Sequence, residues 1–172
     1  MNRPQPHEFA PFYAKYIEKV KDDVMEELEE QSITIPDFLR TTPADKVNFA
    51  YAEGKWTLKE VLGHIIDTER IMAYRLLRFS RKDTQPLLGF DENEYVKNSG
   101  YLSRGFEGLV DEFELLRKSN LFLFNSLRQE DLPLSGTANG QRITVRALLF
   151  VIAGHAKHHK EIIKERYLQF SY

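Results

Sequence analysis

The sequence predicts an all-α protein, a four-helix bundle with long connections between its helices. Four segments of similar length carry apolar residues at three- and four-residue steps, which is the period of an amphipathic helix. No segment shows a convincing alternation of apolar and polar residues, so no strand is expected. With 172 residues, 42% of them hydrophobic, the chain is long enough to bury a core without a disulfide. We therefore expect a single domain over residues 1–172.

The first expected helix runs from about Glu8 to Glu30. Charged residues separate the members of its apolar stripe, which are Phe9, Phe12, Tyr16, Val20, Val24 and Leu28. Pro36 and Pro43 then interrupt the pattern, so a long connection to about Lys55 is expected.

The second expected helix begins with a clear capping box. The side chains of Thr57 and Glu60 can each bond the free backbone N–H of the other residue. An apolar stripe continues from there to about Arg81. The polar stretch from Asp83 to Gly100 contains Gly and Pro and is expected to be a connection.

The third expected helix begins at Ser103, and its stripe ends at Leu127. Residues 131–142 contain one proline and two glycines and are expected to form a loop. Thr144 can cap a fourth helix that runs to about Tyr167. The two long connections exceed what an up-down bundle needs, so either the topology includes a crossover or these loops cover one end.

Composition excludes several classes of function. The net charge is −2 and no block of basic residues occurs, which argues against a nucleic-acid partner. No apolar stretch is long enough to span a membrane, and the N-terminus lacks the apolar core of a signal peptide, so a cytoplasmic location is expected by default. Because cysteine is absent, any metal must be held by nitrogen and oxygen ligands.

Three of the five histidines form a candidate metal site. His155 and His159 are four residues apart and continue the inward stripe of the fourth helix, so both rings are expected on one buried face. Two imidazoles at this spacing can chelate one ion. His64 lies in the second helix and follows Gly63, a residue that lets helices approach closely. The alternative is that each is a hydrogen-bonded core histidine without a metal.

Other histidines and metal motifs fit less well. His158 is turned by about 100° from the face of its neighbours, so it is expected behind the ligands or at the surface. His7 is expected in solvent. The H-E-x-x-H and E-x-x-H patterns are missing, as are Gly-rich phosphate loops and the G-x-S-x-G elbow.

Polar residues near His64 allow two interpretations each. Asp67 could accept a ring N–H or act as a general base, or it could be a surface residue paired with an arginine. Arg75 could hold an anionic group, or it could be solvated. Glu69 and Arg70 are expected at the surface. The apolar loop 86–91 could cover a pocket or pack at the end of the bundle.

Two segments carry a resemblance to a known family. These are W-T-L-K-E-V-L-G-H-I-I-D-T-E-R (residues 56–70) and G-H-A-K-H-H-K-E-I (residues 154–162). A Trp before one mid-helix His, an Asp three residues after it, and a late H-x-x-x-H resemble the DinB/YfiT-like superfamily. The resemblance covers nearly the whole chain, since the helix order and the long loops also agree.

The resemblance implies a four-helix bundle in which His64, His155 and His159 bind one divalent ion, zinc or nickel. Related members are thiol-dependent transferases or isomerases that use a low-molecular-weight thiol, and dimers are plausible in this family. Members near the bacillithiol-transferase branch tend to have aromatic residues just before the late histidine, where this chain has Phe150-Val151-Ile152-Ala153.

Two classes of function therefore stay open. One is a metal-dependent enzyme acting on a small molecule, either a thiol S-transferase or a hydrolase. The other is a non-catalytic bundle in which the metal fastens two helices and the protein acts by association.

Overall fold

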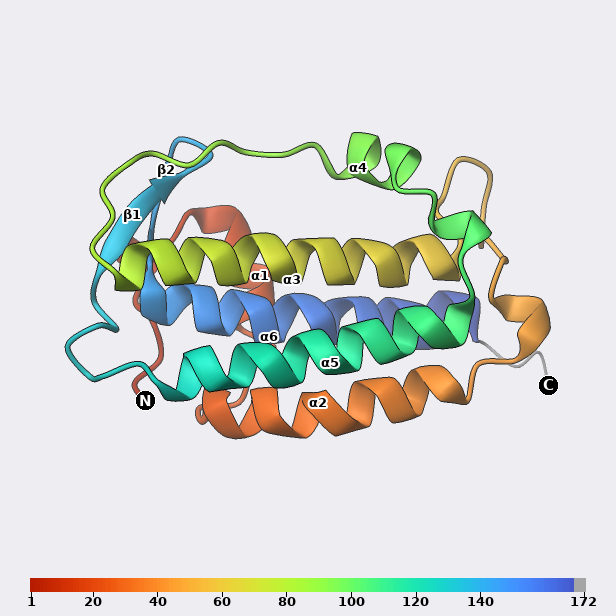
Figure 1. Cartoon of the computed structure of the whole chain (residues 1–172), viewed down its shortest axis with the longest axis horizontal. Coiled ribbons are helices and arrows are strands. Elements are labelled where there is room, and N and C mark those ends of the chain that lie inside the picture. The colour runs from red at the N-terminus through yellow and green to blue at the C-terminus, as the bar shows by residue number, and fades with distance from the viewer. Residues whose placement is uncertain (169–172) are drawn as a thin grey trace.

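The long helices α2 (Val24–Arg40), α3 (Leu58–Ser80), α5 (Phe106–Asn125) and α6 (Val145–Ile162) lie side by side in the computed structural model, which describes residues 1–168 (Figure 1). This confirms the predicted helical bundle. The single-domain expectation over 1–172 stays a prediction, and its last four residues lie outside the described part. The shorter elements are η1 (Pro6–Glu8), η2 (Pro11–Tyr13), α1 (Ala14–Ile17), η3 (Ala44–Lys46), α4 (Glu92–Asn98), η4 (Tyr101–Ser103), β1 (Ser135–Ala138), β2 (Gln141–Thr144) and the π-helical turn η5 (Ile163–Tyr167).

The connection between α3 and α5 is a crossover. In Figure 1 these two helices point in the same direction, and α2 and α6 point in the other. The chain must therefore return along the whole bundle between residues 81 and 105, and it carries α4 and η4 on the way. A long connection is thus required by the topology, as one of the two sequence alternatives proposed.

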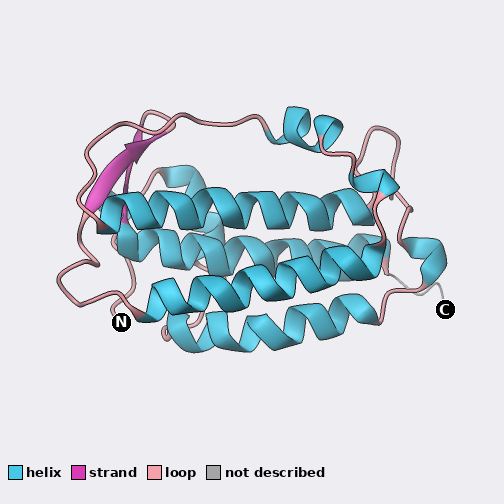
Figure 2. Cartoon of the chain, in the orientation of Figure 1, coloured by secondary structure: helices cyan, strands magenta, loops and turns pink. Residues whose placement is uncertain are grey.

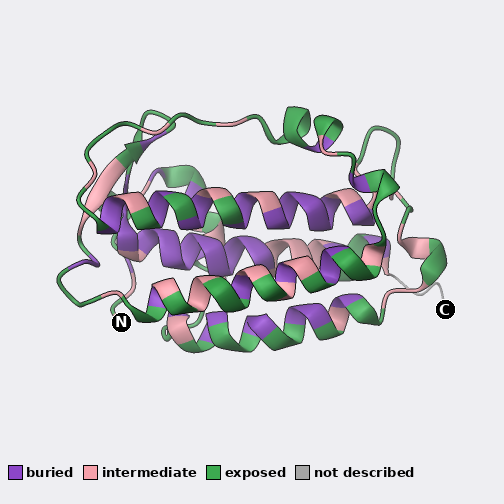
Figure 3. Cartoon of the chain, viewed as in Figure 1, coloured by how far each residue is buried: buried purple, intermediate pink, exposed green. Residues whose placement is uncertain are grey.

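Helix α6 is the most deeply buried of the long helices. From Val145 to Ala156 every residue except Arg146 is buried, and the helix packs against α1, α2 and α3 (Figure 3). Helix α1 comes closest at Gly154, where a Cβ atom would collide with the backbone carbonyl of Tyr16. His155 therefore sits in the interior of the protein, whereas His158 and His159 on the following turn are half-buried. No helix within residues 1–168 is both long and apolar enough to cross a membrane.

The predicted caps are confirmed at both helices of the candidate site. At the start of α3 the backbone N–H of Glu60 donates to Thr57 Oγ1 at 3.2 Å, and the N–H of Thr57 donates to Glu60 Oε2 at 2.8 Å. At the start of α6 the N–H of Ala147 donates to Thr144 Oγ1 at 3.1 Å. These bonds satisfy N–H groups that the first helical turn leaves unpaired, and they fix where each helix begins.

The prediction of one helix over 8–30 is wrong. The chain forms only the 3-10 turn η2 and the short α1 there, turns, and begins α2 at Val24. Asp23 caps α2 by accepting from the N–H groups of Met25 and Glu26. The guanidinium of Arg3 donates to the carbonyls of Ile17 at 2.8 Å and Val20 at 2.6 Å. These bonds provide partners for backbone carbonyls at the end of α1 and in the turn that follows it. The predicted apolar stripe is therefore divided between separate elements, with Tyr16 in α1 and Leu28 in α2, rather than carried by one helix.

The expected interruption at Pro36 is also wrong, because α2 continues through this residue to Arg40. A proline inside a helix removes one hydrogen bond and costs about 3 kcal/mol. Pro36 is buried here together with Ile35 and Leu39 on the inner face of α2. Burial of this apolar face offsets the local cost.

A β-hairpin and the helix α4 lie in segments that were expected to be loops. Strands β1 and β2 form an antiparallel hairpin (Figure 2), and its turn residues Asn139 and Gly140 both have positive φ, 51° and 71°. An Asn-Gly pair is a strong hairpin signal, so this element could have been predicted. Helix α4 is capped by Asp91, which accepts from the N–H groups of Asn93 and Glu94. With these elements added, the protein is still predominantly helical, as the sequence predicted.

Glu69 is not a surface residue, contrary to the sequence-based expectation. It is buried in α3 and forms a bidentate ion pair with Arg117 of α5, with both N–O distances 2.7 Å. Arg117 also donates to Gln31 of α2 at 2.8 Å, and Gln31 donates to the carbonyl of Ala153 in α6 at 3.0 Å. Asn120 donates a further bond to Glu69 at 3.2 Å. One buried polar network therefore joins the four long helices.

Candidate metal centre

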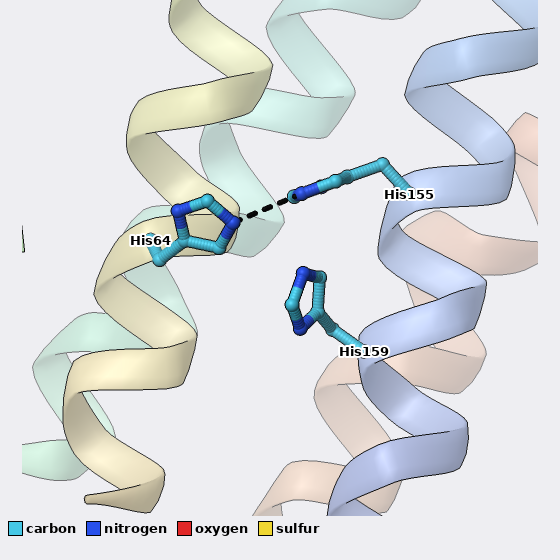
Figure 4. Close-up of side chains that lie close together, drawn as sticks. All are labelled: His64, His155 and His159. Carbon is cyan, nitrogen blue, oxygen red and sulfur yellow. Dashed lines mark hydrogen bonds between the residues drawn. The ribbon is translucent and has the colours of Figure 1, made fainter. Parts of the chain in front are cut away.

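Three histidine rings converge between α3 and α6. His64 projects from α3, and His155 and His159 project from successive turns of α6, so that the rings face one another (Figure 4). The Nε2 atoms of His64 and His155 are 3.0 Å apart. One ring nitrogen from each of the three residues lies within 4.8 Å of the other two. The structure thus brings together the three residues that the sequence singled out.

The local sequence explains how each ring reaches this place. His155 and His159 are four residues apart in a regular helix, so their side chains lie one above the other. Their ring centroids are 4.5 Å apart, and each lies 4.9 Å from that of His64. Gly63 does not serve the close helix approach expected from the sequence. The space beside it is filled by the ring of Tyr101, which packs on α3 from η4.

Burial keeps all three rings uncharged. Loss of hydration lowers the pKa of His64 to about 4 and that of His159 to about 3. The same cause holds the pKa of His155 well below its ordinary value, and the neighbouring His159 and His64 add to the effect. At neutral pH each imidazole therefore offers a lone pair, which is the form that binds a metal.

The arrangement fits a divalent ion. Two nitrogen ligands of a tetrahedral zinc ion lie about 3.3 Å apart when each bond is ~2.0–2.1 Å long, close to the separation of the His64 and His155 nitrogens. The Nδ1 atom of His159 is buried without a hydrogen-bond partner in the described part of the chain. A buried polar atom normally finds such a partner, so this nitrogen leaves one hydrogen bond unmade beside the cluster.

Aromatic side chains surround the cluster. The indole of Trp56 lies 4.9 Å from the ring of His64, between centroids. Tyr16 of α1 lies 5.4 Å from both His155 and His158. His158 is half-buried and is not one of the three residues whose ring nitrogens converge, which agrees with its position on a different face of the helix.

Two cavities reach the cluster from different sides. One has a volume of about 130 Å³ and is lined by His64, His155, Tyr16, Thr68, Arg75 and Asn139, among others. The other, of about 270 Å³, is lined by His159, Trp56, Val61 and Tyr167, among others. A small molecule could therefore approach the three rings by either route.

Several residues of the smaller cavity were not identified from the sequence. Thr68 lies one turn after His64 on the same face of α3, a spacing that could have found it. Asn139 comes from the overlooked hairpin turn. Gly89 and Phe90 also line this cavity, so the loop 86–91 covers a pocket, as one alternative held. The loop is fixed to the hairpin by Leu87, which bonds backbone groups of Thr137 and Asn139.

Asp67 lines a different hollow, together with Tyr95, Tyr101 and Arg104. Its carboxylate lies 3.8 Å from the guanidinium of Arg70. Burial raises the pKa of the Tyr101 phenol, and the nearby Asp67 raises it further. Asp67 is thus a half-buried aspartate that lies beside an arginine, which agrees with the pairing in the second interpretation. A role for Asp67 as a base or as a partner of a ring N–H stays a prediction.

The chain matches one protein family over most of its length and is similar in fold to a solved structure. Residues 27–163 match the family model described as the DinB superfamily. Among solved structures the chain is similar to YfiT from Bacillus subtilis, described as a probable metal-dependent hydrolase with an unusual four-helix bundle topology. The TM-score is 0.76 at 18% identity, over 84% of this chain and 83% of that chain. A search of the curated proteins found no match.

Proposed function

Because this chain belongs to the DinB superfamily, we propose that His64, His155 and His159 hold one divalent metal ion and that the protein acts with it on a small molecule. The observation that carries the proposal is the convergence of three uncharged ring nitrogens beside a cavity. Hydrolysis is the first reaction we propose, since the structurally similar YfiT is described as a probable metal-dependent hydrolase.

The donor set supports zinc or nickel. Imidazole nitrogen suits both ions, and the absence of cysteine removes the thiolate ligands that would favour a closed structural site. Held by His64, His155 and His159, a divalent ion would keep a coordination position for a ligand from outside the protein, and it would supply Lewis-acid chemistry there.

The residues of the smaller cavity would orient the substrate. Its walls combine the apolar and aromatic surfaces of Val151, Tyr16 and Phe90 with a few polar groups, the usual composition of a small-molecule site. Thr68 carries a buried hydroxyl without a hydrogen-bond partner in residues 1–168, so this group is free to bond a polar substrate atom. The apolar walls would shield part of a bound substrate from bulk water.

Transfer of a low-molecular-weight thiol is the second candidate. A transferase must hold two substrates next to each other, and the two cavities reach the cluster from different sides, one beside His155 and the other beside His159. The larger cavity could take the thiol while the smaller one holds the electrophile. The non-catalytic alternative is less favoured, because a metal that only fastens two helices needs no access route.

Removal and return of the metal tests the proposal. We expect chelator-treated protein to be inactive on a panel of small esters, amides and lactones, and we expect zinc or nickel to restore hydrolysis. The His155→Ala variant should stay inactive with either ion, because it lacks a ligand. The His158→Ala variant is the matched control, since this neighbouring histidine lies outside the cluster, and it should keep the wild-type rate.

The same experiment separates the alternatives. Hydrolysis that persists in metal-free protein, or in His155→Ala, would contradict the proposal. Conjugation of an electrophile that requires both metal and an added thiol would favour the transferase. A protein that turns over neither panel but melts at a much lower temperature without metal would favour the non-catalytic bundle.

A further inference from the structure

Arg75 is a buried cation without a carboxylate partner. Only 3% of its surface is exposed, and within residues 1–168 no Asp or Glu lies at ion-pair distance from its guanidinium. Arg70 and Arg78 of the same helix differ in this respect, because they pair with Glu112 and Asp83. Arg75 instead donates to the backbone carbonyl of Leu88 at 3.0 Å and lies 3.7 Å from the sulfur of Met72. The guanidinium also lies beside the Tyr13 phenol and 6.0 Å from the centre of the Phe90 ring. None of these partners is negatively charged, so the buried charge has no counter-charge among the described residues.

The guanidinium and the histidine cluster share one cavity. His64, Thr68 and Arg75 all line it, and their spacing of four and seven residues puts them on one face of α3. His64 and Arg75 are eleven positions apart in the helix, and a helical side chain leans toward the N-terminus, here toward His64. The two groups are therefore on the order of 10 Å apart. A single small molecule could span this distance.

Thr68 supplies an independent observation. It is only 4% exposed, its Oγ1 has no hydrogen-bond partner among the described residues, and it lines the cavity between His64 and Arg75. A buried hydroxyl is normally bonded within the protein. The free hydroxyl and a guanidinium without a carboxylate partner line the same wall, and together they indicate a polar ligand.

The remaining groups of the cavity limit the charge of that ligand. Glu92 also lines it, but this residue is exposed and lies at the rim. Burial raises the pKa of the Tyr13 phenol, although the nearby Arg75 opposes the rise, so this hydroxyl stays protonated and adds no negative charge. One cation with an acidic residue at the rim suits a monoanion better than a doubly charged phosphate.

We propose that Arg75 and Thr68 form a carboxylate-binding subsite, and that the small molecule on which this protein acts carries a carboxylate group. The flat guanidinium matches the two oxygens of a carboxylate. The cavity of about 130 Å³ has room for a molecule of on the order of ten non-hydrogen atoms. The statement about the substrate rests on the proposed function, whereas carboxylate binding at Arg75 does not depend on the metal.

Calorimetric titration of chelator-treated protein with butyrate tests the subsite apart from the metal, since a carboxylate could also bind a metal ion. Butyramide serves as the uncharged ligand of the same shape, and inorganic phosphate as the alternative anion. The Arg75→Met variant removes the charge, and Arg75→Lys keeps it without the planar fork. Arg78→Met is the matched control, because Arg78 lies one turn further along α3 and outside the cavity.

We expect wild type and Arg78→Met to bind butyrate but not butyramide, Arg75→Met to bind it at least about tenfold more weakly, and Arg75→Lys to lie between them. Circular dichroism of each variant must match that of wild type, and Arg75→Lys keeps the test decisive if Arg75→Met does not fold. Equal affinity of wild type and Arg75→Met or Arg75→Lys for butyrate would overturn the proposal. So would binding of butyramide as tight as that of butyrate, or tighter binding of phosphate.

Discussion

Replacement of Arg117 by alanine is expected to lower the free energy of unfolding by about 3–5 kcal/mol. Arg117 is fully buried, and its removal would leave the carboxylate of Glu69 buried without a cation. The side-chain oxygen of Gln31 would also lose the N–H donor that it accepts from. Helix α5 would therefore lose the bonds of Arg117 to α2 and to α3 at once. Chemical denaturation of wild type and variant measures the difference.

The control for this prediction is Arg40→Ala. Arg40 also joins α2 to α5, through Asp111 at 2.7 Å and Glu114 at 2.8 Å, but its side chain is 36% exposed. An exposed pair contributes only about 0–1 kcal/mol, so this variant should unfold almost like wild type. Similar losses in the two variants would show that burial does not distinguish the two ion pairs.

Replacement of Gly154 by alanine is expected to destabilise the protein by about 1–3 kcal/mol or more. The added methyl group would collide with the backbone carbonyl of Tyr16, which cannot rotate away as a side chain could. Helix α1 would have to move off α6, and the ring of Tyr16 would leave its place beside His155. The shift in thermal or chemical unfolding measures the cost.

Gly108→Ala is the matched substitution for comparison. Gly108 lies in α5, is exposed, and has nothing within contact distance of an added Cβ atom. Alanine is favoured over glycine inside a helix by about 1 kcal/mol, so this variant should be more stable than wild type. If both substitutions stabilised the protein, the close contact of α1 with Gly154 would not exist in solution.

The helices of the site could be predicted because their signals are local. Thr57 and Glu60 mark the start of α3 within four residues, and the four-residue step from His155 to His159 fixes their common face. His64 could be grouped with them only through the family pattern, because the sequence of α3 does not indicate which helix packs against the face that carries His64. The structure shows that this helix is α6.

Other features could not be predicted because they depend on contacts between distant segments. Glu69 has the sequence context of a surface residue, and its partner Arg117 is 48 positions away. The break near residue 20 depends partly on Arg3, which donates hydrogen bonds to the carbonyls of Ile17 and Val20, 14 and 17 positions later in the chain. The hairpin is different, because the Asn139-Gly140 pair is a local signal from which it could have been predicted. The segment was instead interpreted as a loop between two helices.

Elemental analysis of the purified protein tests the central claim most directly. After loading with zinc or nickel and removal of free ion, wild type and His158→Ala should each contain one ion per chain. His155→Ala and His159→Ala should contain little, because each lacks one of the three converging nitrogens. Equal metal content in wild type and in His155→Ala would contradict a site built from His64, His155 and His159.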